Sequence, residues 1–83
     1  MTLYEAINKL KTPEELKELL DDLCAPSEIH AMENRWNVAK MLSAGKTYQQ
    51  IIDETQLSSA IVSRVKRVLD YGNGALKRMI DSR

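Results

Sequence analysis

The spacing of apolar residues between Lys46 and Leu69 constrains the fold more than any other feature of this sequence. Two short stretches with helical periodicity are joined there by only three residues, Thr55-Gln56-Leu57. In the second stretch the apolar residues recur at every fourth position, as Leu57, Ile61, Val65 and Leu69, with Val62 beside them. Two short helices with so short a connection are typical of a helix-turn-helix. We therefore predict a helix-turn-helix over residues 46–69.

Polar capping residues and prolines mark the starts of further helices in the first half of the chain. Thr2 and Glu5 have the spacing of a capping box, in which each side chain satisfies a free backbone amide. Thr12 precedes Pro13, which suits a first helical position, and leucines follow at helical spacing. The stretch Cys24-Ala25-Pro26-Ser27 interrupts this pattern, because the residue before a proline avoids helical angles.

A longer third helix is expected from about Ser27 to Ser43, ended by Gly45 in a left-handed conformation. One face of this helix should carry an apolar stripe made of Ile29, Met32, Trp36, Ala39 and Leu42. We expect Trp36 to lie in the core or in a dimer interface.

The remaining signals lie beyond Gly45. Thr47 and Gln50 form another expected capping box, which opens a helix of about two turns, and Ser58 is expected to cap a helix that reaches about Leu69. Residues 71–74, Tyr-Gly-Asn-Gly, should break that helix before a weak final one from Ala75 to Asp81, in a C-terminal helical part over residues 75–83. The sequence thus predicts an all-α fold of about six helices in a single domain, residues 1–83.

The formal net charge of the 83-residue chain is zero, but its charges are unevenly distributed. Residues 1–34 contain eight carboxylates and three lysines, which gives a net charge of −5. Residues 35–83 contain nine basic residues and four carboxylates, which gives +5. Such an asymmetry indicates an anionic partner for the C-terminal half. Chance clustering in a short chain is the alternative explanation.

The polar face of the second predicted helix of the helix-turn-helix has the chemistry of a DNA-reading surface. Opposite the apolar stripe lie Ser59, Ala60, Ser63, Arg64 and Arg67. Small residues near a helix start allow close approach to a major groove, and an arginine binds guanine in a bidentate manner. Capped helix starts also point free amides toward phosphates. The candidate DNA-binding residues are Lys46, Thr47, Gln49, Gln50, Ser58, Ser59, Ser63, Arg64 and Arg67.

A plainer interpretation stays open, since a charged outer face is usually only a solvated face. On that interpretation the chain is a helical protein-interaction module that keeps a helix-turn-helix shape without binding DNA. The zero net charge and the sparse basic face favour this alternative. Two positions also depart from the usual pattern, because Gln56 stands where a glycine with positive φ is usual and Ile52 where a small residue is usual.

Three motifs point to a family. They are DLC-x-P-x-E-I at residues 22–29, K-T-Y at residues 46–48 and SRVKR-x-L-x-YGN at residues 63–73. With the rest of residues 3–74, they resemble the tryptophan-repressor superfamily and, within it, small bacterial TrpR-like proteins of the YerC/YecD type. The resemblance implies an intertwined homodimer that binds double-stranded DNA in a sequence-specific manner and regulates transcription, as a repressor. It also implies that residues 1–44 are dimerisation helices.

In tryptophan-dependent members of this superfamily, the ligand lies between the helix-turn-helix and the dimer core. Arg35 and Arg64 match the two arginines of that pocket, whereas Ile61, Val65 and Val68 stand where the repressor has Thr, Gly and Ser. The three bulkier apolar groups would fill the space. We therefore expect these five residues to form only a vestigial pocket and tryptophan not to bind. Any other small-molecule effector is left open.

Enzymatic activity is not expected, because the sequence has no glycine-rich phosphate loop, paired-carboxylate motif or nucleophile elbow. His30 is the only histidine, and Glu33 one turn on does not complete a metal site, so neither a metal nor a cofactor is expected. Cys24 cannot form an intramolecular disulfide and is expected to be a small core residue. The sequence shows no signal-peptide pattern and no membrane span, so we expect a cytoplasmic protein that is nucleoid-associated when bound to DNA.

Overall fold

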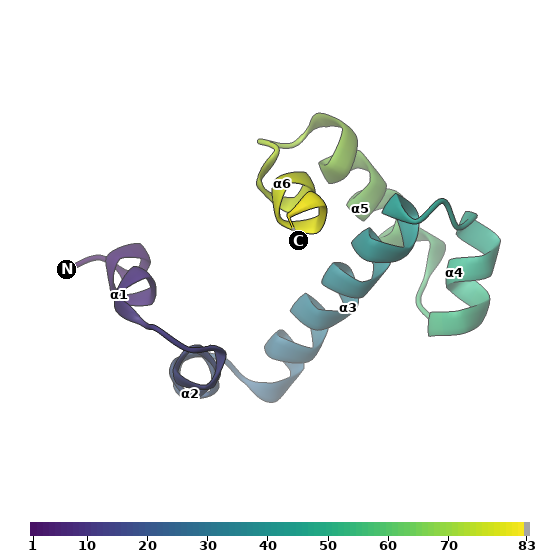
Figure 1. The fold of residues 1–83 in the computed structure, drawn as a ribbon. Coiled ribbons are helices and arrows are strands. Elements are labelled where there is room, and N and C mark those ends of the chain that lie inside the picture. The colour runs from purple at the N-terminus through teal and green to yellow at the C-terminus, as the bar shows by residue number, and fades with distance from the viewer. Residues whose placement is uncertain (83) are drawn as a thin grey trace. The chain divides into compact units, whose positions relative to one another are not determined.

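The computed structural model describes residues 1–82, and within that range it contains six helices and no strand (Figure 1). The helices are α1 Leu3–Lys9, α2 Pro13–Leu23, α3 Pro26–Ser43, α4 Tyr48–Thr55, α5 Ser59–Tyr71 and α6 Ala75–Asp81. The predicted all-α fold is confirmed. Contacts divide the chain into two compact units, unit 1 (Met1–Ala31) and unit 2 (Met32–Arg83), which are described separately below.

Three predicted boundaries are wrong by one or two residues. The third helix begins at Pro26, and α4 includes Thr55, so the connection to α5 is Gln56-Leu57-Ser58. The α5 helix continues to Tyr71, two residues beyond its expected end near Leu69. The last helix spans Ala75–Asp81 as expected, with Ser82 in an extended conformation as its C-cap. Residue 83 lies outside the described range.

In unit 1, the predicted capping of both helices is confirmed. The Thr2 hydroxyl accepts a hydrogen bond from the Glu5 amide, and the Glu5 carboxylate accepts one from the Thr2 amide, each at 3.1 Å. The hydrogen bond from the Thr2 amide to the carboxylate lowers the pKa of Glu5, and the Thr2 hydroxyl lowers it further. On α2 the Thr12 hydroxyl accepts from the Glu15 amide at 3.1 Å, with Pro13 at the first helical position.

Unit 1 is rich in leucine but has no buried side chain among its described residues. Leu10, Leu16, Leu19 and Leu20 are half-buried, whereas Leu3 and Leu23 are 50% and 56% exposed. Cys24, expected in the core, is only half-buried. An apolar surface of this kind on a small helical unit marks an interaction site rather than a finished core.

Unit 2 contains the hydrophobic core, to which three helices contribute fully buried residues. The core consists of Val38 and Ala39 from α3, Ile51 from α4, and Val62 and Val65 from α5. Half-buried apolar residues surround it: Met41, Leu42, Ile52, Leu57, Ile61, Leu69, Leu76 and Ile80. The predicted apolar stripe of α5 therefore faces the core, as expected from its four-residue spacing.

The stripe predicted on α3 is only partly in this core. Ala39 and Leu42 contribute, but Met32 and Trp36 are 42% and 37% exposed in the isolated chain. Val38, which is outside the predicted stripe, is completely buried instead. Apolar residues occur on several sides of α3, so the sector that packs is selected by α4 and α5 and not by periodicity. The Trp36 ring lies 5.9 Å from the Lys40 ammonium, within range of a cation–π contact.

A Schellman motif ends α3 and turns the chain toward α4. Gly45 has a φ of 89°, as predicted for a left-handed cap. The Lys46 amide donates to the Met41 carbonyl at 3.1 Å and the Gly45 amide to the Leu42 carbonyl at 3.0 Å. These bonds satisfy carbonyls that the last helical turn leaves free. The α3–α4 corner is thereby fixed by backbone hydrogen bonds.

Gln56 takes the left-handed conformation for which a helix-turn-helix usually uses glycine. Its φ is 61°, and it is the one non-glycine residue with positive φ among residues 1–82. The Gln56 amide donates to the Ile52 carbonyl at 2.8 Å, and its side-chain amide donates to the Asp53 carbonyl at 2.8 Å. The side chain thus compensates in part for the backbone strain.

We expect Gln56→Gly to stabilise the protein by about 0.5 kcal/mol. A side chain in the left-handed region costs roughly 1–2 kcal/mol, and the lost exposed hydrogen bond offsets about half of that gain. Gln56→Val should instead destabilise by about 1–2 kcal/mol, because a β-branched residue tolerates positive φ poorly. Thermal unfolding followed by circular dichroism measures both. A glycine variant that melts below the valine variant would contradict this account of the turn.

The turn between α5 and α6 depends on Gly72. A Cβ atom added at Gly72 would lie 2.5 Å from the Val68 carbonyl oxygen, closer than any side chain allows. The Asn73 carboxamide then accepts from the Ala75 amide at 3.1 Å and opens α6. The close approach of Gly72 to the Val68 carbonyl explains the predicted break at residues 71–74.

Candidate nucleic-acid interface

Helices α4 and α5 pack against each other and are joined by three residues. Ile51 of α4 and Val62 and Val65 of α5 meet in the core, which fixes the pair as one unit. Their starts are capped by Thr47 and Ser58, both with extended backbone angles. We call this pair, residues 47–71, the α4–α5 unit.

The outer side of α5 carries the residues that the sequence placed there. We define the α5 face as Ser59, Ala60, Ser63, Arg64 and Arg67, all of which are exposed. Within residues 1–82, neither arginine of this face has a hydrogen bond or an ion pair to another side chain. The two guanidinium groups are therefore unneutralised and open to an anionic partner.

The start of α5 adds backbone donors next to this face. The Ser58 hydroxyl accepts from the Ile61 amide, and the Ser58 carbonyl accepts from the Val62 amide, both at 3.3 Å. The amides of Ser59 and Ala60 come before those of Ile61 and Val62 in the helix, and the first turn offers them no acceptor. They point, with the positive end of the helix dipole, in the direction that suits a phosphate.

Several other candidate residues already have intramolecular partners. Thr47 and Gln50 form the predicted capping box, with bonds of 3.1 and 2.9 Å between each side chain and the other's amide. The Gln49 carboxamide donates to the Asp53 carboxylate at 2.8 Å. Their assignment to DNA stays a prediction, since capping and phosphate binding use the same residue types.

The sequence did not indicate the ion pair between Lys46 and Glu54. The Lys46 ammonium lies 2.8 and 2.7 Å from the two carboxylate oxygens of Glu54. The two residues are eight apart, a spacing that no simple helix rule connects. Only the corner before α4 brings them together.

The five residues of the predicted vestigial pocket differ in burial. Val65 is 3% exposed and belongs to the core, and Ile61 is half-buried beside it. Val68 is 43% exposed, and Arg35 and Arg64 are exposed as well. The Val65 side chain thus already fills space in the core beneath α5.

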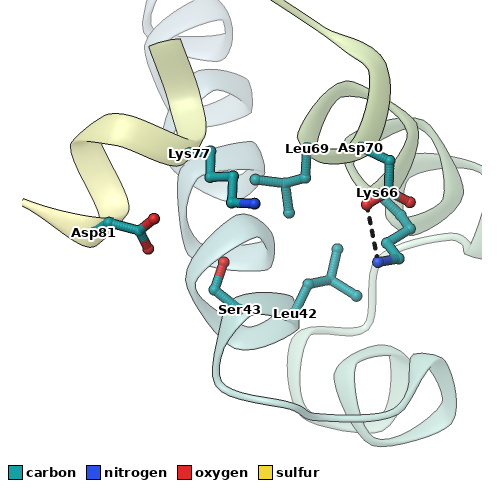
Figure 2. Close-up of a pocket in the computed structure, with 7 residues that line it drawn as sticks. All are labelled: Leu42, Ser43, Lys66, Leu69, Asp70, Lys77 and Asp81. Atoms are coloured by element: carbon teal, nitrogen blue, oxygen red, sulfur yellow. Dashed lines mark hydrogen bonds and ion pairs between the residues drawn. The ribbon is translucent and has the colours of Figure 1, made fainter. Parts of the chain in front are cut away.

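A cavity of about 230 Å³ lies elsewhere in unit 2, between α3, α5 and α6 (Figure 2). It is lined by Leu42, Ser43, Lys66, Leu69, Asp70, Lys77 and Asp81. Lys66 is neutralised by Asp70 at 3.1 Å on the same helix. None of the predicted pocket residues lines this cavity.

Within residues 1–82, no three histidine, cysteine, aspartate or glutamate side chains are close enough to hold a metal ion. No helix in this range combines the length and apolar character needed to span a membrane.

Comparison with known proteins places the chain in a family. The Trp repressor protein family matches residues 1–83, the full length of the sequence. The chain belongs to this family, as the sequence motifs indicated.

The relatives agree in sequence and fold. The chain is 46% identical over 79 residues to the uncharacterized protein YerC of Bacillus subtilis (strain 168), covering 95% of this chain and 76% of YerC. A Staphylococcus aureus crystal structure, provisionally described as a Trp repressor, is 43% identical with a TM-score of 0.88, covering 95% and 79% of the two chains. A TrpR-like protein of Eubacterium eligens ATCC 27750 is 39% identical with a TM-score of 0.89, covering 95% and 81%. The TrpR-like fold is confirmed, and the family suggests a regulator rather than an enzyme.

Proposed function

We propose that this protein is a sequence-specific regulator of transcription that binds double-stranded DNA, acts as a repressor and places α5 in the major groove. The observation that carries the proposal is the α5 face, where small side chains precede two unneutralised arginines, next to the free amides of Ser59 and Ala60. Small residues permit close approach, the arginines suit guanine or phosphate, and the amides suit phosphate. Membership of the Trp repressor family supports the same function.

The proposal includes a homodimer. Unit 1 exposes leucines that it does not bury itself, and a second copy of the chain would cover them. Two α5 helices related by a two-fold axis would then address two half-sites of a duplex. A regulator of this kind works in the cytoplasm, at the nucleoid when bound.

A helical protein-interaction module is the second candidate. The exposed Met32 and Trp36 of α3 and the zero net charge are the observations that favour it. Gel shifts against random and genomic fragments at two salt concentrations separate the two functions. The regulator should select a subset of genomic fragments and lose affinity steeply with salt, through counterion release. Absence of any shift would favour the interaction module, whereas equal shifts on every fragment would contradict sequence-specific binding.

We expect no specific binding of tryptophan. Val65 fills space at the core, and the apolar Ile61 and Val68 offer the ligand no hydrogen-bonding group. Isothermal titration calorimetry at micromolar protein should show no heat beyond dilution, with lysine as the matched amino-acid control. A saturable signal with micromolar affinity for tryptophan alone would contradict this expectation.

A further inference from the structure

Lys46 connects the corner after α3 with the far end of α4. Its amide donates to the Met41 carbonyl as part of the Schellman motif, and it directly precedes Thr47, the cap of α4. Its ammonium reaches both carboxylate oxygens of Glu54, one residue before α4 ends at Thr55. The backbone and side chain of one residue therefore connect the end of α3, the start of α4 and the last turn of α4.

The geometry of this pair differs from that of two other ion pairs in the described part of the chain. Lys17–Asp21 and Lys66–Asp70 each join neighbouring turns of a single helix. Lys46–Glu54 instead joins a residue outside α4 to one inside it, with side chains 39% and 51% exposed. Contact with both carboxylate oxygens uses two of the three donors of the ammonium and neutralises its charge.

Glu54 also stands where a carboxylate is unfavourable. It lies in the last turn of α4, where the negative end of the helix dipole disfavours an anion. The Lys46 ammonium offsets the charge of the Glu54 carboxylate at that end of the helix. The turn that follows, with Gln56 in the left-handed conformation, leads directly into α5.

We propose that Lys46 is a positioning residue of the α4–α5 unit and not a phosphate ligand. Held by Glu54, it fixes α4 against the α3 corner and so fixes the direction in which α5 leaves the turn. The inference rests on the proposed DNA-binding function, and it gives Lys46 a different role from the one that its basic side chain suggests.

A charge-swap experiment tests this role. The proteins are wild type, Lys46→Glu, Glu54→Lys and the double variant, measured by fluorescence anisotropy on a preferred duplex over a salt series. Lys46→Glu should weaken binding about tenfold or more and lower the melting temperature. The double variant should regain wild-type affinity within about threefold, with an unchanged salt slope, because the reversed pair restores the same connection. Lys17→Met removes the pair with Asp21 within α2, away from α5, and should leave the affinity within about twofold of wild type.

The outcomes separate the possible failures. If Lys46 is a phosphate ligand, the double variant stays weak and its salt slope falls by about one, which overturns the positioning role. If the change in melting temperature of the double variant equals the sum of the two single-variant changes, the two charges do not interact. The pair then does not hold the α3–α4 corner, and the proposal is again overturned. If wild type binds no duplex while that coupling persists, the proposed DNA-binding function fails and the mechanical connection alone is supported.

Discussion

Arg64→Ala is expected to weaken binding to the preferred duplex by about 1–3 kcal/mol, or roughly five- to 150-fold, and to relax sequence selectivity. Arg64 lies on the first half of α5, next to Ser63 and exposed, in the part of the helix that enters a groove first. Arg67 lies almost one turn further along the same face. Arg67→Ala should weaken all duplexes alike and lower the salt slope by about one, as expected for a phosphate contact.

Fluorescence anisotropy on preferred and random duplexes, each over a salt series, measures both effects. Arg78→Ala on α6 is the matched control, since it removes an exposed arginine outside the α5 face. If Arg64 instead lines the vestigial pocket, Arg64→Ala would mainly lower the melting temperature. Wild-type affinity in both folded variants would contradict the assignment of DNA binding to α5.

Leu23→Glu is expected to raise the dissociation constant of the homodimer by about 30- to 150-fold or more. Leu23 is 56% exposed in the single chain, so a carboxylate there should not disturb unit 1 itself. Burial of the remaining surface by a partner contributes about 1–1.5 kcal/mol per copy, and the two-fold symmetry of a dimer doubles the loss to about 2–3 kcal/mol. Burying a glutamate adds a further cost.

Analytical ultracentrifugation at micromolar concentration measures this change, with Asp22→Ala on the exposed side of α2 as the control. Wild type should sediment as a dimer and Leu23→Glu should shift toward monomer. A wild-type chain that is a well-folded monomer at these concentrations would contradict the homodimer.

Local signals in the sequence predicted the helices well, because capping depends on residues three apart. Thr2, Thr12, Thr47 and Ser58 all cap where their types and spacings indicated. The departure from glycine at Gln56 also identified the residue with positive φ, since the turn requires that conformation whatever residue is present. The family resemblance was also correct.

Features that depend on packing between helices could not be predicted in the same way. Val38 is buried because of where α4 and α5 lie, and the apolar residues spread around α3 did not single it out. The Lys46–Glu54 pair exists only through the corner at Gly45. Within the candidate site, the sequence indicated the α5 face, but it could not separate capping side chains such as Gln50 from those free to bind a ligand.

The central claim, that α5 binds the DNA, is tested most directly by NMR. Uniformly ¹⁵N-labelled protein is titrated with its preferred duplex, and the amide shifts are followed residue by residue. The account predicts the largest changes between Ser59 and Arg67, including the free amides of Ser59 and Ala60, and small changes in α1 and α2. Changes confined to α1, α2 or the exposed side of α3, with α5 unaffected, would contradict it.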